Sequence, residues 1–203
     1  MATKDLPDDP TPPEMYAPTI EAMQKDRKFL ASRHFIIGCG CVTLDPAPRR
    51  RVLLVLNHKH DIYQIPKGRK NIGEDMAAAA VRETYEETGY RPTLLPARVP
   101  TRATPAHTAA DGPDVTETVV CCEPVASVVH PDPYSGAMKM VFFFLATGDS
   151  EAEQVQGTQD ESWEELEAVW VPADTAAATL TFKEDGNVVE CALEVARANG
   201  VDI

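Results

Sequence analysis

The alternation of apolar and polar residues predicts short strands around one central helix. The apolar stretches 35–44 and 52–56, joined by the proline-bearing segment 45–51, indicate a β-hairpin. The alanine- and glutamate-rich stretch 74–88 is followed by Gly89, which is typical of a helix and its stop. Further strands are expected at 62–65, 94–99, 117–130, 137–146 and 167–171, and helices at 173–180 and 187–199. This order favours an α/β fold, with a mixed sheet between helices.

The two ends of the sequence differ in character. Residues 1–13 are polar and rich in proline, so we expect a flexible tail. A loosely helical pattern at 15–32 predicts a short lead-in helix. Residues 1–32 are therefore expected to precede one catalytic domain at 33–203. Within that domain, the polar segment 100–114 predicts a mobile loop.

Composition limits the possible functions. The 203 residues carry a formal net charge of −13, which disfavours nonspecific nucleic-acid binding. An anionic substrate must therefore meet a local basic patch or a metal ion. No apolar run approaches the roughly 20 residues of a membrane span, and the N-terminus is unlike a signal peptide. We expect a cytoplasmic protein, with a nuclear location also open to a chain of this size; the sequence names no protein partner.

Five cysteines without a secretion signal favour reduced thiols over a disulfide framework. Cys39 and Cys41 fall on one face of an expected strand, and Cys121 and Cys122 are adjacent. Neither pair has the spacing of a zinc ribbon. We therefore expect both pairs to be buried core residues.

Three carboxylates of the expected helix 74–88 carry the candidate chemistry. Glu83, Glu86 and Glu87 are spaced so that all three project from one helical face. Converging carboxylate oxygens suit hard cations such as Mg²⁺ or Mn²⁺. Taken alone, such a helix more often presents a solvated acidic face. Arg82 lies about two turns from Glu74 and could pair with its carboxylate.

The surrounding residues decide between these readings. Residues 68–90, GRKNIGEDMAAAAVRETYEETGY, resemble the Nudix box, G-x5-E-x7-R-E-U-x-E-E-x-G-U, in which U is aliphatic. Two positions depart from the pattern, Thr84 and Tyr90, and neither has a catalytic role in the family. The fixed positions are all filled, by Gly68, Glu74, Arg82, Glu83, Glu86, Glu87 and Gly89.

This resemblance implies a Nudix-type α/β/α sandwich and a metal-dependent pyrophosphohydrolase. It implies that Glu83, Glu86 and Glu87 bind the metals, with the Gly68 carbonyl as a further ligand. It also implies a supporting salt bridge between Glu74 and Arg82. The general base stays open between Glu86, Glu87 and an acid outside the box. Candidates for such an acid, or for a solvated acidic loop, are Glu161, Glu164 and Glu165.

The residues before the box bear on the substrate. The run Tyr63-Gln64-Ile65-Pro66-Lys67-Gly68-Arg69 is similar to a stretch of the diadenosine tetraphosphate and diphosphoinositol polyphosphate hydrolases. Cationic side chains at the mouth of a metal site can bind further phosphates. The expected substrate-binding residues are Lys67, Arg69, Lys70, Arg33 and Tyr63.

Other side chains could extend this set. His34 and the triplet 49–51 are basic, although the triplet is better explained as a solvated hairpin turn. Tyr134 and Phe182 could stack on an adenine, but isolated aromatic residues more often lie in the core. Without a clear pair of stacking aromatics, the basic mouth favours a compact, highly phosphorylated ligand.

The leading function is hydrolysis of diadenosine polyphosphates, diphosphoinositol polyphosphates, or both. Cleavage of nucleotide sugars such as ADP-ribose, or of RNA caps, is a second enzymatic reading. A noncatalytic sensor of nucleotides or inositol phosphates is a third reading, from another class. Since degenerate boxes mark such sensors and every acid is present here, the sequence favours turnover.

Overall fold

The computed structural model describes residues 25, 27–101, 103, 117–159 and 165–203. Residues 33–203 form one compact unit. Most of the helix expected at 15–32 lies outside the described residues, and the described residues 27–31 carry no helix or strand. A short 3-10 helix, η1, follows at Ser32–His34.

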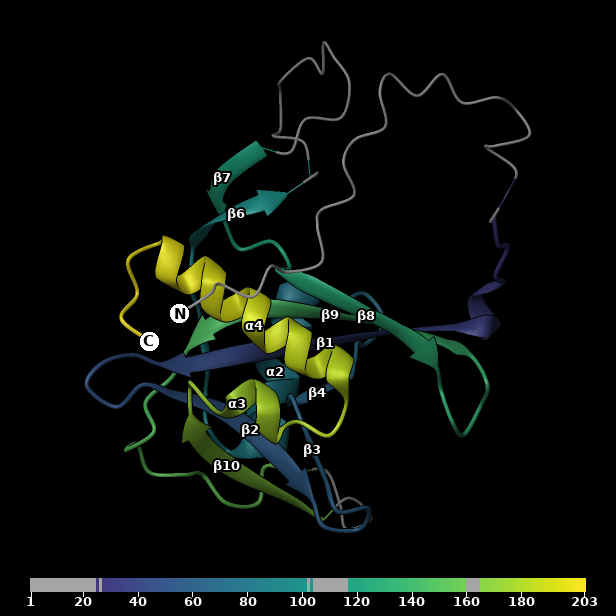
Figure 1. Ribbon diagram of the computed structural model, residues 1–203. Helices are drawn as coiled ribbons and strands as arrows, with labels where there is room; N and C mark the ends of the chain where they lie inside the picture. Colours follow the sequence, from purple (N-terminus) through teal and green to yellow (C-terminus); the bar gives the residue numbers. More distant parts are fainter. Residues whose placement is uncertain (1–24, 26, 102, 104–116, 160–164) are drawn as a thin grey trace. The chain divides into compact units, whose positions relative to one another are not determined.

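A mixed sheet forms the centre of the unit, as Figure 1 shows. Its central order is β10-β2-β1-β9-β5. Strands β1 and β9 run parallel, and the other pairs are antiparallel. The strands of this path are β1 (Phe35–Asp45), β2 (Arg51–Asn57), β5 (Thr93–Leu94), β9 (Met138–Thr147) and β10 (Leu166–Pro172). The prediction of a hairpin at 35–56 is confirmed by the β1–β2 pairing.

Three further strands join this sheet, and two of them fill the space where β1 and β2 diverge. Strand β3 (Ile62–Gln64) pairs with β2, and β4 (Lys67–Arg69) pairs with β1. Gly40 lets β4 approach closely, because a Cβ there would fall 2.2 Å from the Pro66 carbonyl oxygen. On the other side, β8 (Ala126–Pro131) pairs with β9. A separate two-stranded sheet consists of β6 (Ala97–Thr101) and β7 (Glu117–Cys121).

Helices cover both faces of the large sheet, which confirms the predicted α/β architecture. Helix α2 (Met76–Thr88) packs on one face, against a small core that includes Cys39, Cys41 and Phe144. Helix α4 (Lys183–Ala198) packs on the other face, over a larger core centred on residues such as Phe143. In Figure 1, α4 crosses in front of the sheet and α2 lies behind it. The short helix α3 (Ala176–Thr179) contacts α4.

Several predicted boundaries were wrong. The expected strand 94–99 is divided into β5 and β6, and the expected strand 117–130 into β7 and β8. Strand β4 was not among the predicted strands, and α4 begins at Lys183, four residues earlier than predicted. Most of the expected loop 100–114 lies outside the described residues. No described helix is long and apolar enough to span a membrane.

Helix α2 is fixed at both ends by local contacts. Asp75 Oδ1 accepts hydrogen bonds from the backbone N–H groups of Ala77 and Ala78, at 2.9 and 3.1 Å, as an N-cap does. The helix ends at Gly89, which adopts the left-handed conformation with φ of 72°. A Cβ on Gly89 would fall 2.2 Å from the Val155 carbonyl oxygen. Glycine is therefore required there both by the backbone conformation and by the close approach of the 154–159 segment.

This double requirement can be tested by Gly89→Ala, with Gly157→Ala as the matched control. Gly157 has a similar φ of 75°, but a Cβ there would meet nothing within 4 Å. We expect Gly157→Ala to lower the free energy of unfolding by about 1 kcal/mol, the cost of a left-handed alanine. Gly89→Ala adds an overpacking cost, so we expect a loss of about 3 kcal/mol or more. Urea denaturation measures both, and equal losses would contradict the packing argument.

Candidate active site on helix α2

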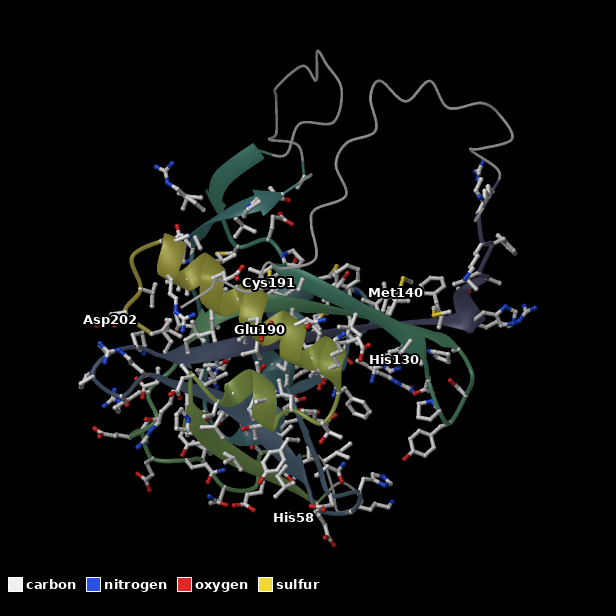
Figure 2. The ribbon with its side chains drawn as sticks, in the orientation of Figure 1. His58, His130, Met140, Glu190, Cys191 and Asp202 are labelled. Atoms are coloured by element: carbon white, nitrogen blue, oxygen red, sulfur yellow. The ribbon has the colours of Figure 1, made fainter. Side chains whose placement is uncertain are left out.

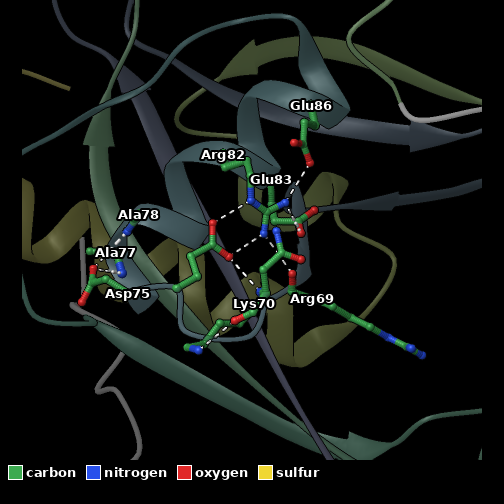
Figure 3. Close-up of polar contacts among 10 residues, drawn as sticks. Arg69, Lys70, Asp75, Ala77, Ala78, Arg82, Glu83 and Glu86 are labelled. Atoms are coloured by element: carbon green, nitrogen blue, oxygen red, sulfur yellow. Dashed lines mark hydrogen bonds and ion pairs between the residues drawn. The ribbon is translucent and has the colours of Figure 1, made fainter.

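The guanidinium of Arg82 organises the acidic face of α2. Its Nε and Nη2 atoms donate to the two oxygens of Glu74, at 2.7 and 2.8 Å. Its Nη1 donates to Glu83 Oε1 at 2.6 Å and to Glu86 Oε2 at 2.8 Å. Nη2 also donates to the Arg69 carbonyl oxygen at 3.0 Å, so the helix is tied to β4 (Figure 3). The predicted ion pair between Glu74 and Arg82 is confirmed, and it is bidentate.

This arrangement perturbs the ionisation of its members. The hydrogen bonds from Arg82 lower the pKa of the Glu74 carboxyl to about 2. The carboxylates in turn raise the pKa of Arg82 above its ordinary value, the Glu74 hydrogen bonds most of all. Burial raises the pKa of Glu83, and Arg82 opposes that rise. Arg82 therefore holds in place acids that would otherwise repel one another on a single helix face.

Strand β4 contacts two of the three candidate metal ligands. Gly68 faces α2 so closely that a Cβ on it would fall 1.8 Å from Glu83 Oε2. One residue earlier, the Lys67 backbone N–H donates to Glu87 Oε2 at 2.8 Å. Glycine is thus the residue that lets Glu83 lie against the strand. The structure therefore brings Glu83, Glu86, Glu87 and Gly68 together around β4 and Arg82.

The chemistry of these donors fits a hard divalent cation. Three carboxylates and a backbone carbonyl are oxygen ligands of the kind that Mg²⁺ and Mn²⁺ prefer. In the described part of the chain, however, no three Asp, Glu, His or Cys side chains stand in the geometry of a finished metal site. Arg82 Nη1 engages one oxygen of Glu83 and one of Glu86. Those two oxygens meet at a single nitrogen atom, so the carboxylates already converge.

The two departures from the box pattern have structural explanations. Thr84 is fully buried, and its hydroxyl oxygen accepts a hydrogen bond from the Cys41 backbone N–H at 3.1 Å. An aliphatic side chain could not make that bond between α2 and β1. Tyr90 packs edge-on against Trp170 of β10, with ring centroids 5.5 Å apart. Both residues support the packing of α2 on the sheet.

The expected substrate-binding residues lie in different surroundings. Lys67 is half-buried, and its Nζ donates to Gln64 Oε1 at 2.6 Å. The exposed Arg69 side chain points away from the carboxylates (Figure 3). Lys70 Nζ bonds to the Asn71 carbonyl oxygen at 3.0 Å. Thus β4 and the residue after it carry three cations, and Arg69 is directed away from the α2 acids.

The remaining two expected binding residues are more remote from those acids. Tyr63 is half-buried on β3, and its backbone bonds to Thr181 in both directions, at 2.9 and 3.1 Å. Arg33 is exposed, and Nε donates to His34 at 3.1 Å. Among the described residues, neither side chain has a hydrogen bond or ion pair with the α2 carboxylates.

Sequence reasoning missed how the end of α2 is held. Thr158 Oγ1 donates to the Glu86 carbonyl oxygen at 3.0 Å, and Gln159 Nε2 donates to that of Glu87 at 3.2 Å. Gln154 Nε2 donates to the Thr88 carbonyl oxygen at 2.9 Å. These side chains satisfy backbone carbonyls that a helix end leaves without partners, two of them on candidate metal ligands. No periodicity marks such contacts, because they join segments about 70 residues apart.

Two other expectations need correction. Tyr134 and Phe182 are 79% and 49% exposed, so the core assignment of these rings was wrong. The half-buried Arg49 is tied to Asp45, Asp149 and Glu151, and Arg50 to Asp202, so the basic triplet is not simply solvated. Among the additional acids, Glu161 and Glu164 lie outside the described residues. Glu165 is exposed in a loop.

The cysteines separate into two groups. Cys39 and Cys41 are fully buried beside α2, as expected, and burial raises the pKa of their thiols to about 11 and about 12. Cys122 is exposed and Cys121 is half-buried, so the prediction of a second buried pair was wrong. No disulfide joins any of the five cysteines, which include the half-buried Cys191.

The chain is similar to known proteins both in sequence and in structure. A sequence model of the NUDIX domain matches residues 34–190. The chain belongs to the Nudix family. An Ap4A hydrolase from C. elegans, solved as a binary complex, superimposes with a TM-score of 0.55 at 18% identity, covering 80% of this chain and 98% of the other. A NUDIX hydrolase from Nitrosomonas europaea gives 0.51 at 15% identity, covering 78% and 88%. This Nudix chain is therefore a pyrophosphohydrolase of that fold.

The pKa of Glu74 predicts how its ion pair contributes to stability. The carboxyl titrates at about 2 when folded and at 4.5 as an ordinary glutamate, so its contribution is complete above pH 4.5. It is lost as the pH falls from 4.5 toward 2. We expect Glu74→Gln to lower the free energy of unfolding by about 2 kcal/mol at pH 7, and by clearly less at pH 3.

The control for this experiment is Glu167→Gln, which removes an exposed partner of His58. An exposed pair of this kind contributes about 0.5 kcal/mol or less, so the control should change little at pH 7. Urea titrations at pH 7, 4 and 3 provide the comparison. A Glu74→Gln deficit that does not shrink on acidification would show that charge is not its origin.

Proposed function

We propose that this protein is a Mg²⁺- or Mn²⁺-dependent pyrophosphohydrolase acting on diadenosine polyphosphates, diphosphoinositol polyphosphates, or both. The observation that carries the proposal is the meeting of Glu83 and Glu86 at Arg82 Nη1, beside Glu87 and the cations of β4. A helix with three acids alone would be compatible with a solvated face. Acids gathered around one arginine beside a cationic strand are better suited to a metal and a polyphosphate.

In this proposal Glu83, Glu86, Glu87 and the Gly68 carbonyl hold the metal. Bound there, a divalent ion would neutralise phosphate charge, activate a water molecule and stabilise the leaving phosphate. Arg82 keeps the carboxylates oriented, and Glu74 fixes Arg82 in turn. Glu86, Glu87 or an acid outside the box accepts the proton of the attacking water.

The cations of β4 give the site its preference for several phosphates. Lys67 and Arg69 point their side chains away from α2, and Lys70 follows them directly. Guanidinium and ammonium groups bind phosphate oxygens by charge-assisted hydrogen bonds. Because the chain carries a net charge of −13, these local cations and the metal must overcome repulsion of an anionic substrate. A substrate with a chain of phosphates uses both.

The structural comparisons bear on the fold and leave both members of the proposed pair as substrates to test. The structural neighbours include an Ap4A hydrolase, but its sequence identity to this chain is 18%, which shows a shared fold and no shared substrate. Cleavage of ADP-ribose or RNA caps is the alternative within the family. A sensor without turnover is the alternative from another class, and the complete set of box acids argues against it.

The proposal is tested by the turnover of a substrate panel with Mg²⁺ or Mn²⁺. The panel contains diadenosine tetra-, penta- and hexaphosphate, diphosphoinositol pentakisphosphate, ADP-ribose and capped RNA. We expect turnover of one or both of the first two classes. Glu86→Gln removes a proposed metal ligand, so we expect kcat to fall by at least about 100-fold.

Glu167→Gln is the control here too, because it removes a carboxylate on β10 whose partner is His58. Its activity should equal that of the wild type. Binding of the substrates without turnover by the wild type would replace the proposal by the sensor reading. Turnover of ADP-ribose or capped RNA alone would favour the alternative enzymatic reading.

A further inference from the structure

Successive carbonyl groups at the end of α2 each receive a hydrogen bond from one short segment, 154–159. A helix leaves its last carbonyl groups without partners inside the helix. The carbonyls are those of Glu86, Glu87, Thr88 and Gly89, and the donors are Thr158 Oγ1, Gln159 Nε2, Gln154 Nε2 and the Val155 N–H, at 3.0, 3.2, 2.9 and 3.1 Å in that order. The 154–159 segment therefore completes the hydrogen bonding of α2 from outside the helix.

The end of α2 is an unfavourable place for two carboxylates. The C-terminus of a helix carries partial negative charge, which destabilises acidic side chains nearby. Glu86 and Glu87 both lie in the last turn of α2, and that turn contains no basic residue. A helix with this ending frays readily on its own. Donors from the 154–159 segment offset the negative charge of the carbonyls where these two candidate metal ligands stand.

The chain that leads into the 154–159 segment is fixed to the end of β1. The Ser150 N–H donates to Asp45 Oδ2 at 2.9 Å, and Asp45 is only 2% exposed. Two residues earlier, the Gly148 N–H donates to the Leu44 carbonyl oxygen, also at 2.9 Å. The segment thus starts from a point that is held by the central sheet.

The far end of the segment is fixed to β10. Gln159 Nε2, which donates to the Glu87 carbonyl oxygen, also donates to that of Leu166, the first residue of β10, at 2.9 Å. The His58 N–H donates to the Glu165 carbonyl oxygen at 2.9 Å, and Figure 2 shows His58 at this end of the sheet. One amide group therefore connects the last turn of α2 to a paired strand, so the helix end is restrained by the sheet.

The candidate metal ligands depend on this restraint to different degrees. Glu83 lies one turn before Glu87, inside α2, so its backbone position does not depend on the helix end. The backbones of Glu86 and Glu87 move with any unwinding of the last turn. Arg82 Nη1 and the Lys67 N–H contact the carboxylates of these two residues, at 2.8 Å each, and not their backbones. The distance between the inner ligand and the outer pair is therefore set by the contacts at the carbonyls.

Divalent cations differ in how strictly they require such a distance. Mg²⁺ needs a nearly ideal octahedron of oxygen atoms at about 2.1 Å, whereas Ca²⁺ accepts six to eight oxygen atoms in a flexible arrangement at about 2.4 Å. Displaced ligands therefore weaken Mg²⁺ binding more than Ca²⁺ binding. Ligands held within about 0.5 Å of the required geometry favour the smaller ion.

We propose that Thr158, Gln159 and Gln154 are positioning residues of the metal site, which hold the last turn of α2 so that Glu86 and Glu87 favour Mg²⁺ over Ca²⁺. This inference rests on the proposed pyrophosphohydrolase function and deepens it. It assigns the choice of metal to a segment outside the box, and that segment acts through the backbone of α2.

The test measures metal binding to the full chain without substrate. The electron paramagnetic resonance signal of free Mn²⁺ gives the Kd for Mn²⁺, and displacement by MgCl₂ or CaCl₂ gives the Kd for the other two ions. The double variant Thr158→Val/Gln159→Met removes two donors and keeps the side chains close in size. We expect its Kd for Mg²⁺ to rise about tenfold, as when the partners of metal ligands are lost. The Kd for Ca²⁺ should rise about threefold or less, because its geometry is less strict.

Two further variants separate positioning from general stability. Thr158→Ser keeps the hydroxyl donor, so it should bind both ions as the wild type does, whereas Thr158→Val alone should show part of the loss. Thr179→Val is the matched control, because Thr179 is also half-buried and its Oγ1 donates to the Thr175 carbonyl oxygen of α3 at 3.0 Å. It should leave both Kd values unchanged. A thermal melt checks that every variant is folded at the temperature of the titration.

The inference is overturned if the double variant keeps the wild-type ratio of Mg²⁺ to Ca²⁺ affinity, because the contacts then only stabilise the fold. It is also overturned if Thr158→Ser loses as much Mg²⁺ affinity as Thr158→Val. A wild type that binds none of the three ions would overturn the proposed metal-dependent function and this inference together. Normal metal binding and turnover by the wild type, with unchanged variants, would overturn this inference alone.

Discussion

The bidentate ion pair between Arg82 and Glu74 is the interaction on which the acidic site depends. One guanidinium spans Glu74, Glu83, Glu86 and the Arg69 carbonyl oxygen, so it neutralises the helix face and ties α2 to β4. Without it, the closely spaced acids of one helix would repel one another and turn toward solvent. Glu74 accepts hydrogen bonds from Nε and from one N–H of Nη2, and this pairing fixes the plane of the guanidinium. Nη1 is then directed toward Glu83 and Glu86. The supporting pair is therefore a condition for the candidate ligands to converge.

The end of α2 is constrained by a second, independent set of contacts. Donors from the 154–159 segment satisfy the carbonyls of Glu86, Glu87, Thr88 and Gly89. The absence of a Cβ at Gly89 permits that approach. Helix ends usually fray, and here the last turn carries two candidate metal ligands. These contacts limit that fraying through the backbone carbonyls and do not themselves use the carboxylates of Glu86 and Glu87.

Local patterns predicted what depends on neighbours in sequence. The hairpin of β1 and β2, the limits of α2 and the pair of Glu74 and Arg82 all follow from spacing within one short segment. The divided strands β5–β6 and β7–β8 did not follow, because apolar composition alone does not show where pairing partners change. Nor did the contacts of Thr158 and Gln159 with the end of α2. Those depend on how a segment distant in sequence folds back onto the helix, which no single segment encodes.

The alternation of side chains along β4 joins the two charged groups of the protein. Gly68 faces α2, where the lack of a side chain makes room for Glu83. Lys67 and Arg69, one position to either side, face α4 by the period of two of a strand. The Lys67 N–H is directed away from β1, toward Glu87. The three-residue strand β4 thus has its own cations on one face and the carboxylates of α2 against the other face. Glu87 of α2 lies at the edge of the strand. In the proposed function, cations on the α4 side attract the phosphates of the substrate, and the acids on the α2 side hold the metal at the bond to be broken.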